Sequence, residues 1–204
     1  MYKKAAFLFN KKGYASASIR QICRAIGIRE SSLYHYIRSK EDLLYNICEW
    51  SMLQSLEAIE PIARSNLRPD LKLEKMIETH IITIAQNSNE HATMLKELRS
   101  LNLRNQRKIV RLRDQYEALF RKVIANCVKG KLFRPVNVKI TTLILLGMMN
   151  WLIHWYREDG PMDIEEIASV FSDLFLKGPR QKVKILGSER KRVYMVPALG
   201  EYLV

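Results

Sequence analysis

The chain lacks the short motifs that usually mark an enzyme. None of its 204 residues forms a GxGxxG loop, a Walker A loop or an HExxH zinc motif. Among the histidines, His35 has no nucleophile or carboxylate beside it. His154 lies between Trp151 and Trp155, which is typical of an interface or pocket histidine rather than a base. We therefore predict no catalytic residue, no metal site, no cofactor and no enzyme activity.

Cysteine is scarce, and its spacing excludes the usual cysteine sites. Cys23, Cys48 and Cys127 are far apart, and each lies among apolar residues with helical spacing. No CxxC pair or Cys/His spacing suggests a zinc site. We interpret the three as small buried hydrophobic residues in a reducing cytosol, which predicts a cytoplasmic location.

A long hydrophobic run is also missing. The most apolar stretch, residues 140–153, is interrupted by Thr, Gly and Asn. It is shorter than the roughly 20 apolar residues that a membrane-spanning helix needs. The N-terminus, Tyr2-Lys3-Lys4, leads into a helical pattern rather than a signal peptide. We expect no membrane partner, and we interpret residues 140–153 as part of a buried or interface helix over residues 137–157.

Strand-like alternation is absent before residue 180. Apolar residues instead recur at spacings of three, four and seven, and Gly and Pro fall between the stripes. This pattern predicts an all-α fold. We expect a long helix to start at Ser39 and end before Pro61, and a last helix to run from Asp163 to Gly178-Pro179. His80 falls on an apolar helix face, and His91 on a stretch that we interpret as a polar loop.

Acidic residues are outnumbered, and the excess of basic charge is unevenly distributed. The formal net charge is +13, with a pI near 9.8. Residues 1–45 hold nine Lys/Arg and three Asp/Glu, while residues 177–204 hold seven and two, so +6 and +5 of the charge lie at the two ends. Basic charge concentrated in this way favours a polyanionic partner.

Two short helical segments joined by a glycine are predicted between Ser18 and Ile37. Ser18 is a suitable N-cap for an apolar stripe that ends before Gly27, a residue that adopts positive φ without a Cβ clash. A second segment starts near Arg29, and we expect Leu33, Tyr36 and Ile37 to face inward. Two short helices around a tight turn with glycine predict a helix-turn-helix.

The same residues resemble the DNA-binding signature of the TetR (tetracycline-repressor-like) transcriptional regulators. The matching segments are Gly13-Tyr14, Ser18-Ile19-Arg20, Ile22, Ala25-Ile26-Gly27-Ile28, Ser32-Leu33-Tyr34-His35-Tyr36-Ile37 and Ser39-Lys40-Glu41-Asp42-Leu43-Leu44. The chain departs from the family in Cys23, in Glu30-Ser31 and in a late start. The resemblance implies a helix-turn-helix domain over 1–46 with a truncated first helix, and a helical effector-binding and dimerisation domain over 47–178. An atypical basic tail follows at 179–204.

The resemblance implies a repressor that binds double-stranded DNA at a palindromic operator and is released by a small molecule. Arg29, Ser31 and Ser32 would lie nearest the base edges, whereas Ser18, Tyr34, His35 and Lys40 would touch phosphates. A helical dimer that no longer binds DNA well, because of its short N-terminus, remains the alternative.

Two further sites are expected, a homodimer interface from the resemblance and an effector pocket from the apolar residues of the central helices. The segment Trp151 to Arg157 and the helix after it look like the homodimer end of the family, with interface candidates Leu146, Trp151, Trp155, Phe171 and Leu174. The segment also resembles regulators of fatty-acid and steroid breakdown, which implies an apolar or acyl-CoA-like effector. Apolar residues of the central helices would line its pocket, namely Met76, Ile77, Ile81, Met94, Leu98, Tyr116 and Phe120.

Overall fold

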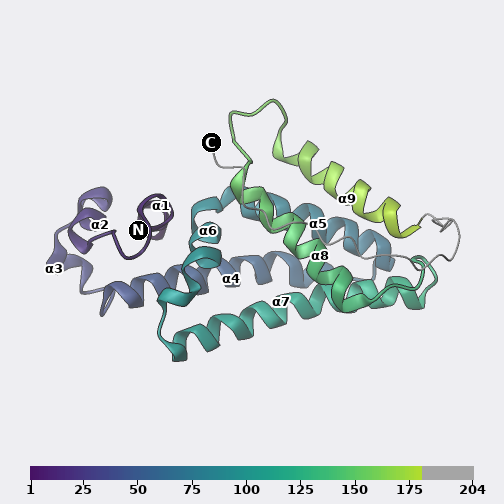
Figure 1. The fold of residues 1–204 in the computed structure, drawn as a ribbon, viewed down its shortest axis with the longest axis horizontal. Helices are drawn as coiled ribbons and strands as arrows, with labels where there is room; N and C mark the ends of the chain where they lie inside the picture. The colour runs from purple at the N-terminus through teal and green to yellow at the C-terminus, as the bar shows by residue number, and fades with distance from the viewer. Residues whose placement is uncertain (181–204) are drawn as a thin grey trace, which may run out of the picture.

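The computed structural model describes residues 1–180 as helices joined by short turns, and no strand occurs in this part of the chain (Figure 1). The all-α prediction is thus confirmed. The predicted tail at 179–204 lies outside the described residues except for its first two positions. The α-helices are α1 (Tyr2–Lys12), α2 (Ile19–Ile26), α3 (Glu30–Leu33), α4 (Lys40–Arg64), α5 (Pro69–Gln86), α6 (Ser88–Glu97), α7 (Leu103–Lys129), α8 (Val138–Asn150) and α9 (Ile164–Arg180).

Helices α1, α2 and α3 form a small unit at one end of the molecule, and α4 leads from it into the larger body (Figure 1). In the body, α5 packs against α4, α7 and α9, while α7 also packs against α4 and α8. Helix α6 lies between the two parts and contacts both α1 and α4. One continuous set of buried apolar side chains runs through both parts.

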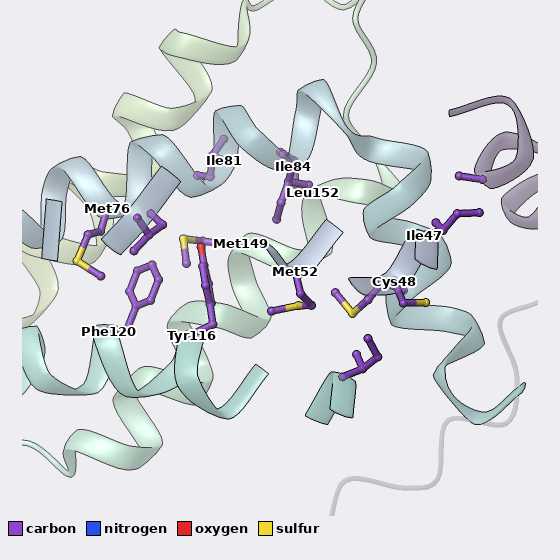
Figure 2. Packing of buried hydrophobic residues seen from close by; sticks show 14 of the residues in the cluster. Ile47, Cys48, Met52, Met76, Ile81, Ile84, Tyr116, Phe120, Met149 and Leu152 are labelled. Atoms are coloured by element: carbon purple, nitrogen blue, oxygen red, sulfur yellow. The ribbon is translucent and has the colours of Figure 1, made fainter. Parts of the chain in front are cut away.

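The core of the body is built from side chains of α4, α5, α7 and α8 (Figure 2). Tyr116 and Phe120 point from α7 into this core, toward Met149 of α8 and Met76 of α5 (Figure 2). All three cysteines are buried, as the sequence predicts. No helix among the described residues is long and apolar enough to cross a membrane.

Three helix boundaries differ from the sequence predictions. Helix α4 continues one turn past Pro61 to Arg64, although the proline ring removes one backbone donor. Helix α9 runs through Gly178-Pro179 to Arg180. The helix expected over 137–157 ends at Asn150 and gives way to a 3₁₀ turn, η2 (Trp151–His154), in which Leu152 is buried while Trp151 is exposed.

Candidate DNA-reading surface and effector cavity

The helix-turn-helix is formed by α2 and α3, as predicted. The Ser18 hydroxyl accepts a hydrogen bond from the Gln21 N–H, and the Gln21 side chain accepts from the Ser18 N–H, which closes a reciprocal capping box. Gly27 adopts φ 87°, ψ 32°, and its N–H donates to the Cys23 carbonyl oxygen at 2.9 Å. This left-handed conformation ends α2 and turns the chain toward α3, which is why the position needs glycine.

The outer face of α3 is polar and exposed. Arg29, Ser31 and His35 are exposed and Tyr34 is 52% exposed, whereas Ser32 is half-buried. The one acid of this segment, Glu30, pairs with Arg20 of α2 at 3.4 Å. The pair offsets a negative charge that would otherwise repel phosphates.

Tyr36 does not face inward as predicted. The regular helix ends at Leu33, and the chain continues through tight turns in which Ile37 is buried and Tyr36 is 72% exposed. The spacing of four from Leu33 to Ile37 preserves the buried face, so the residue before Ile37 turns outward. Tyr36 is thus exposed to solvent, as Tyr34 is.

Lys40 is partly engaged within the protein. Its ammonium donates to the Ala15 carbonyl oxygen at 3.2 Å and lies 4.4 Å from the ring centre of Tyr14. Partial burial lowers the pKa of Lys40, although the Glu97 carboxylate opposes this shift. Lys40 therefore supports the loop before α2.

The start of α4 carries only one half of a capping box. The Ser39 hydroxyl accepts from the Asp42 N–H at 3.0 Å. The Asp42 carboxylate accepts from the Arg38 N–H at 2.9 Å rather than from Ser39. Ser39 is nevertheless the N-cap of α4, as the sequence predicts.

Helix α6 connects the helix-turn-helix unit to the body through hydrogen bonds. The Thr93 hydroxyl donates to the Ala6 carbonyl oxygen at 3.1 Å, and Glu97 accepts from the Tyr14 N–H at 2.9 Å. Lys96 donates to the Asn10 side chain at 2.9 Å. A second connection is made by Glu41 of α4, which accepts from the side chains of Asn102 and Asn105 at the start of α7.

A cavity of about 420 Å³ lies in the body, between α4, α5, α6, α7 and α8. Its buried side includes Met52, His80, His91, Met94 and Tyr116, and its exposed side includes Val110, Arg113, Asp114, Leu143 and Gly147. Leu146 and Asn150 of α8 and Glu117 of α7 also line it. A partly apolar cavity with a few buried polar groups has the character of a small-molecule site.

The structure brings two of the seven predicted pocket residues, Met94 and Tyr116, to this cavity. Met76, Ile77, Ile81 and Phe120 are fully buried in the core instead, and Leu98 is half-buried away from the cavity wall. Helical spacing identifies an inward face, but it does not separate side chains that fill the core from those that border a hollow.

Sequence reasoning missed the polar side of the cavity. His91 is buried on α6 rather than in a polar loop, and its Nε2 lies 3.0 Å from Asn150 Oδ1. His80 Nδ1 lies 2.6 Å from the Tyr116 hydroxyl. Burial lowers the pKa of His80 to about 3 and that of His91 to about 4, so both imidazoles are neutral at physiological pH. Burial also raises the pKa of Tyr116.

The predicted interface residues lie on or near α8, η2 and α9. Trp151 and Leu174 are more than 60% exposed, and Trp155 is 45% exposed and stacks on the half-buried Phe171. Leu146 is half-buried and lines the cavity as well. Further exposed apolar side chains lie on the same elements, namely Ile140, Leu143, Ile144, Met148 and Val170.

Two family models match the chain. The model "Bacterial regulatory proteins, tetR family" matches residues 2–47, and "Tetracyclin repressor-like, C-terminal domain" matches residues 66–179. The chain belongs to the TetR family. It is a DNA-binding transcriptional regulator, and the TetR relatives it matches are regulators rather than enzymes.

Solved structures and a curated relative agree with this assignment. The regulator PfmR from Thermus thermophilus is 34% identical, covering 86% of this chain and 96% of its own, with a TM-score of 0.81. AibR, solved with isovaleryl coenzyme A and operator DNA, is 25% identical over 85% of this chain and 94% of its own, with a TM-score of 0.77. The transcriptional repressor KstR2 of Rhodococcus jostii is 26% identical over 85% of this chain and 86% of its own length.

Proposed function

We propose that this chain is a homodimeric repressor that binds a palindromic operator and leaves it when an acyl-CoA-like effector occupies the cavity. Residues 1–46 read the DNA, and residues 47–178 bind the effector and form the dimer. Such a repressor acts in the cytoplasm, where bacterial DNA is found.

The position of helix α6 is the observation that carries this proposal. One side of α6 supplies His91, Met94 and Leu95 to the cavity wall. Its other side supplies Thr93, Lys96 and Glu97 to α1 and the loop after α1. An effector that displaces α6 by a small amount therefore changes the placement of the helix-turn-helix, and packed elements respond by switching between discrete arrangements.

The DNA-reading residues follow from the exposed face of α3. Arg29 and Ser31 are exposed at the start of α3, where side chains approach base edges in the major groove. Ser32, half-buried, contributes from the inner margin of this face. Phosphate contacts are expected from Tyr34, His35 and the partly exposed Lys40. The N-terminal end of α2, beside Ser18, suits an anion such as a phosphate.

The exposed apolar side chains on α8, η2 and α9 support a homodimer. A monomeric soluble protein rarely exposes a contiguous set of this kind, and Trp is enriched at buried interfaces. A two-fold dimer through Trp151, Trp155, Phe171 and Leu174 covers these side chains. It also sets the two helix-turn-helix units at a fixed separation, which an operator with two half-sites requires.

The lining of the cavity and the AibR structure support an acyl-CoA-like effector. Met52, Met94, Leu95, Leu143 and Leu146 provide flexible apolar contacts for an acyl chain. Arg113 lies at the exposed side of the cavity, so an anionic head group meets a basic side chain there.

The test is operator binding with and without effector. An operator is first selected from random-sequence duplexes, and the affinity is then measured by fluorescence anisotropy in the presence of isovaleryl-CoA, decanoyl-CoA or free coenzyme A. We expect one of the acyl thioesters to weaken binding by about 5–150-fold, the usual range of allosteric coupling, while free coenzyme A has little effect. If the dimer binds no duplex, the alternative of a helical dimer without DNA binding replaces this proposal.

A further inference from the structure

Four polar side chains from four helices meet at the buried side of the cavity. His80 comes from α5, His91 from α6, Tyr116 from α7 and Asn150 from α8. His80, His91 and Tyr116 are each less than 10% exposed, and the two imidazole rings are 6.2 Å apart, edge to face. Polar groups are costly to bury in an otherwise apolar core unless each of them finds a hydrogen-bond partner.

The hydrogen bonds in this cluster fix the direction of each proton. Asn150 Oδ1 only accepts, so His91 donates through its Nε2–H. The Tyr116 hydroxyl lies 2.6 Å from His80 Nδ1. We assign the hydroxyl as the donor and Nδ1 as the acceptor, because this arrangement uses the phenolic proton. A neutral imidazole that accepts at Nδ1 carries its hydrogen on Nε2. His80 is therefore a donor at Nε2.

This donor has no acceptor in the part of the chain that the structure describes. Within residues 1–180, His80 Nε2 is fully buried and makes no hydrogen bond. Asn150 is near enough to oppose the lowering of the His80 pKa, but within these residues its Oδ1 bonds to His91 and Nε2 of His80 has no hydrogen-bond partner. His80 lines the cavity, so a ligand that enters the cavity is the candidate partner for a buried N–H that finds no acceptor among these residues.

We propose that the effector carries an oxygen acceptor, a keto carbonyl within its apolar part, that accepts the Nε2–H of His80. A plain saturated chain leaves this donor unpaired and is therefore the weaker ligand. This inference rests on the proposed function, because it specifies the chemical class of the effector in the same cavity.

The surrounding charges favour a neutral carbonyl over a carboxylate at this point. Burying a carboxylate requires a nearby cation, and both histidines stay neutral because burial holds their pKa values far below 6.5. The charged groups of the cavity are Arg113, Asp114 and Glu117, and they lie on α7. Arg113 and Asp114 belong to the exposed side, and Glu117 pairs with Arg121. A cationic group is disfavoured as well, since it would face a hydrogen-bond donor.

The experiment compares decanoyl-CoA with its oxodecanoyl-CoA isomers, in which one keto oxygen is moved along the chain. Affinities for the full-length protein are measured by isothermal titration calorimetry. We expect at least one isomer to bind about tenfold more tightly than decanoyl-CoA, because it pairs a buried donor that the parent leaves unpaired.

Two variants isolate His80. The double variant His80→Phe/Tyr116→Phe removes both ends of the hydrogen bond and leaves an apolar pair, so it should bind decanoyl-CoA and lose the preference for the keto isomer. Tyr116→Phe alone is the matched control. It keeps the His80 imidazole, and a bound keto oxygen selects the tautomer with hydrogen on Nε2, so the preference should be weaker but still present.

The outcomes separate this inference from the proposed function. The inference is overturned if every isomer and decanoyl-CoA bind the unmodified protein equally. It is also overturned if the preference for a keto isomer survives in the double variant. In both cases the proposal of an acyl-CoA-responsive repressor is unaffected. Operator binding with no affinity for any of these thioesters shows instead that the proposed effector class is wrong, and the inference falls with it.

Discussion

The hydroxyl of Thr93 on α6 donates to the carbonyl oxygen of Ala6 on α1, and both residues are fully buried. The next residue along α6, Met94, lines the cavity. A single helix turn thus touches both the support of the DNA-reading unit and the proposed effector. A shift of this turn would therefore be felt at both sites.

Replacing Thr93 with Val should uncouple the two sites in part. The substitution removes the hydroxyl at nearly constant volume, so stability should fall by about 1 kcal/mol while operator release by the effector becomes less complete. The measurement is operator affinity with and without saturating acyl-CoA. Thr142→Val is the matched control, because Thr142 is equally buried but its hydroxyl bonds to Val138 within α8. Identical coupling in both variants would remove α6 from the mechanism.

Gly27→Ala should destabilise the protein by about 1–2 kcal/mol, since the residue holds φ 87°. A Cβ at this position meets no atom within 4 Å, so the loss comes from backbone strain alone. Gly147→Ala is the control, because it lies inside α8 in open space and should be neutral or slightly stabilising. Chemical denaturation measures the free energy of unfolding of both variants. An unchanged stability of the Gly27→Ala protein would contradict the assigned turn.

Arg29 and Lys40 should affect DNA binding differently. Arg29→Ala should change which operator sequence is preferred, because the side chain is exposed at the start of α3. Lys40→Ala should weaken binding to all operator sequences alike. It should also reduce the slope of log affinity against log salt concentration by about one. It should also lower stability, because Lys40 bonds to Ala15. Binding to a randomised operator library separates the two, and an unchanged preference in Arg29→Ala would argue against α3 as the reading helix.

Stability should fall as the pH drops from about 6.5 toward 4. In the unfolded chain His80 and His91 take up protons near 6.5, whereas in the folded chain their pKa values are lowered to about 3 and about 4. The unfolded state therefore binds more protons throughout this window, and each histidine costs about 2 kcal/mol of stability by pH 5. Urea unfolding at pH 7 and pH 5 tests this. The variant His80→Phe/Tyr116→Phe should show a smaller loss, and an equal loss would contradict the role of His80.

Leu174→Glu should convert the dimer to monomers. Leu174 is 63% exposed on α9, so the change should leave the folded chain intact and place a charge in the proposed interface. Leu103→Glu is the control, because Leu103 is 70% exposed at the start of α7, away from α8 and α9 (Figure 1). Light scattering reports the mass. A monomeric parent protein, or a dimeric Leu174→Glu variant, would rule out this interface.

Most of the fold follows from helical periodicity and from capping residues. Apolar residues expected to face inward on the central helices, such as Ile77 and Phe120, are buried, and Ser18, Gly27 and Ser39 mark real helix ends. The missed boundaries have local causes. Pro61 sits one turn from the end of α4, where the lost backbone bond matters little. Tyr36 lies past the end of α3, in turns that keep Ile37 buried and leave Tyr36 exposed.

The cavity could be anticipated only in outline. Met76 and Phe120 have the same spacing and hydrophobicity as true wall residues, and only tertiary packing decides that they fill the core. The buried pairs His80–Tyr116 and His91–Asn150 join residues 36 and 59 positions apart. No local pattern relates such partners, so a sequence offers no signal for them.

Reciprocal coupling between effector and operator is the most direct test of the account. Calorimetry should compare the affinity of the protein for its acyl-CoA when free and when saturated with operator DNA. If cavity occupancy and DNA reading are linked, operator DNA must weaken acyl-CoA binding by the same factor by which acyl-CoA weakens operator binding. Equal acyl-CoA affinities in the free and DNA-bound protein would contradict the account.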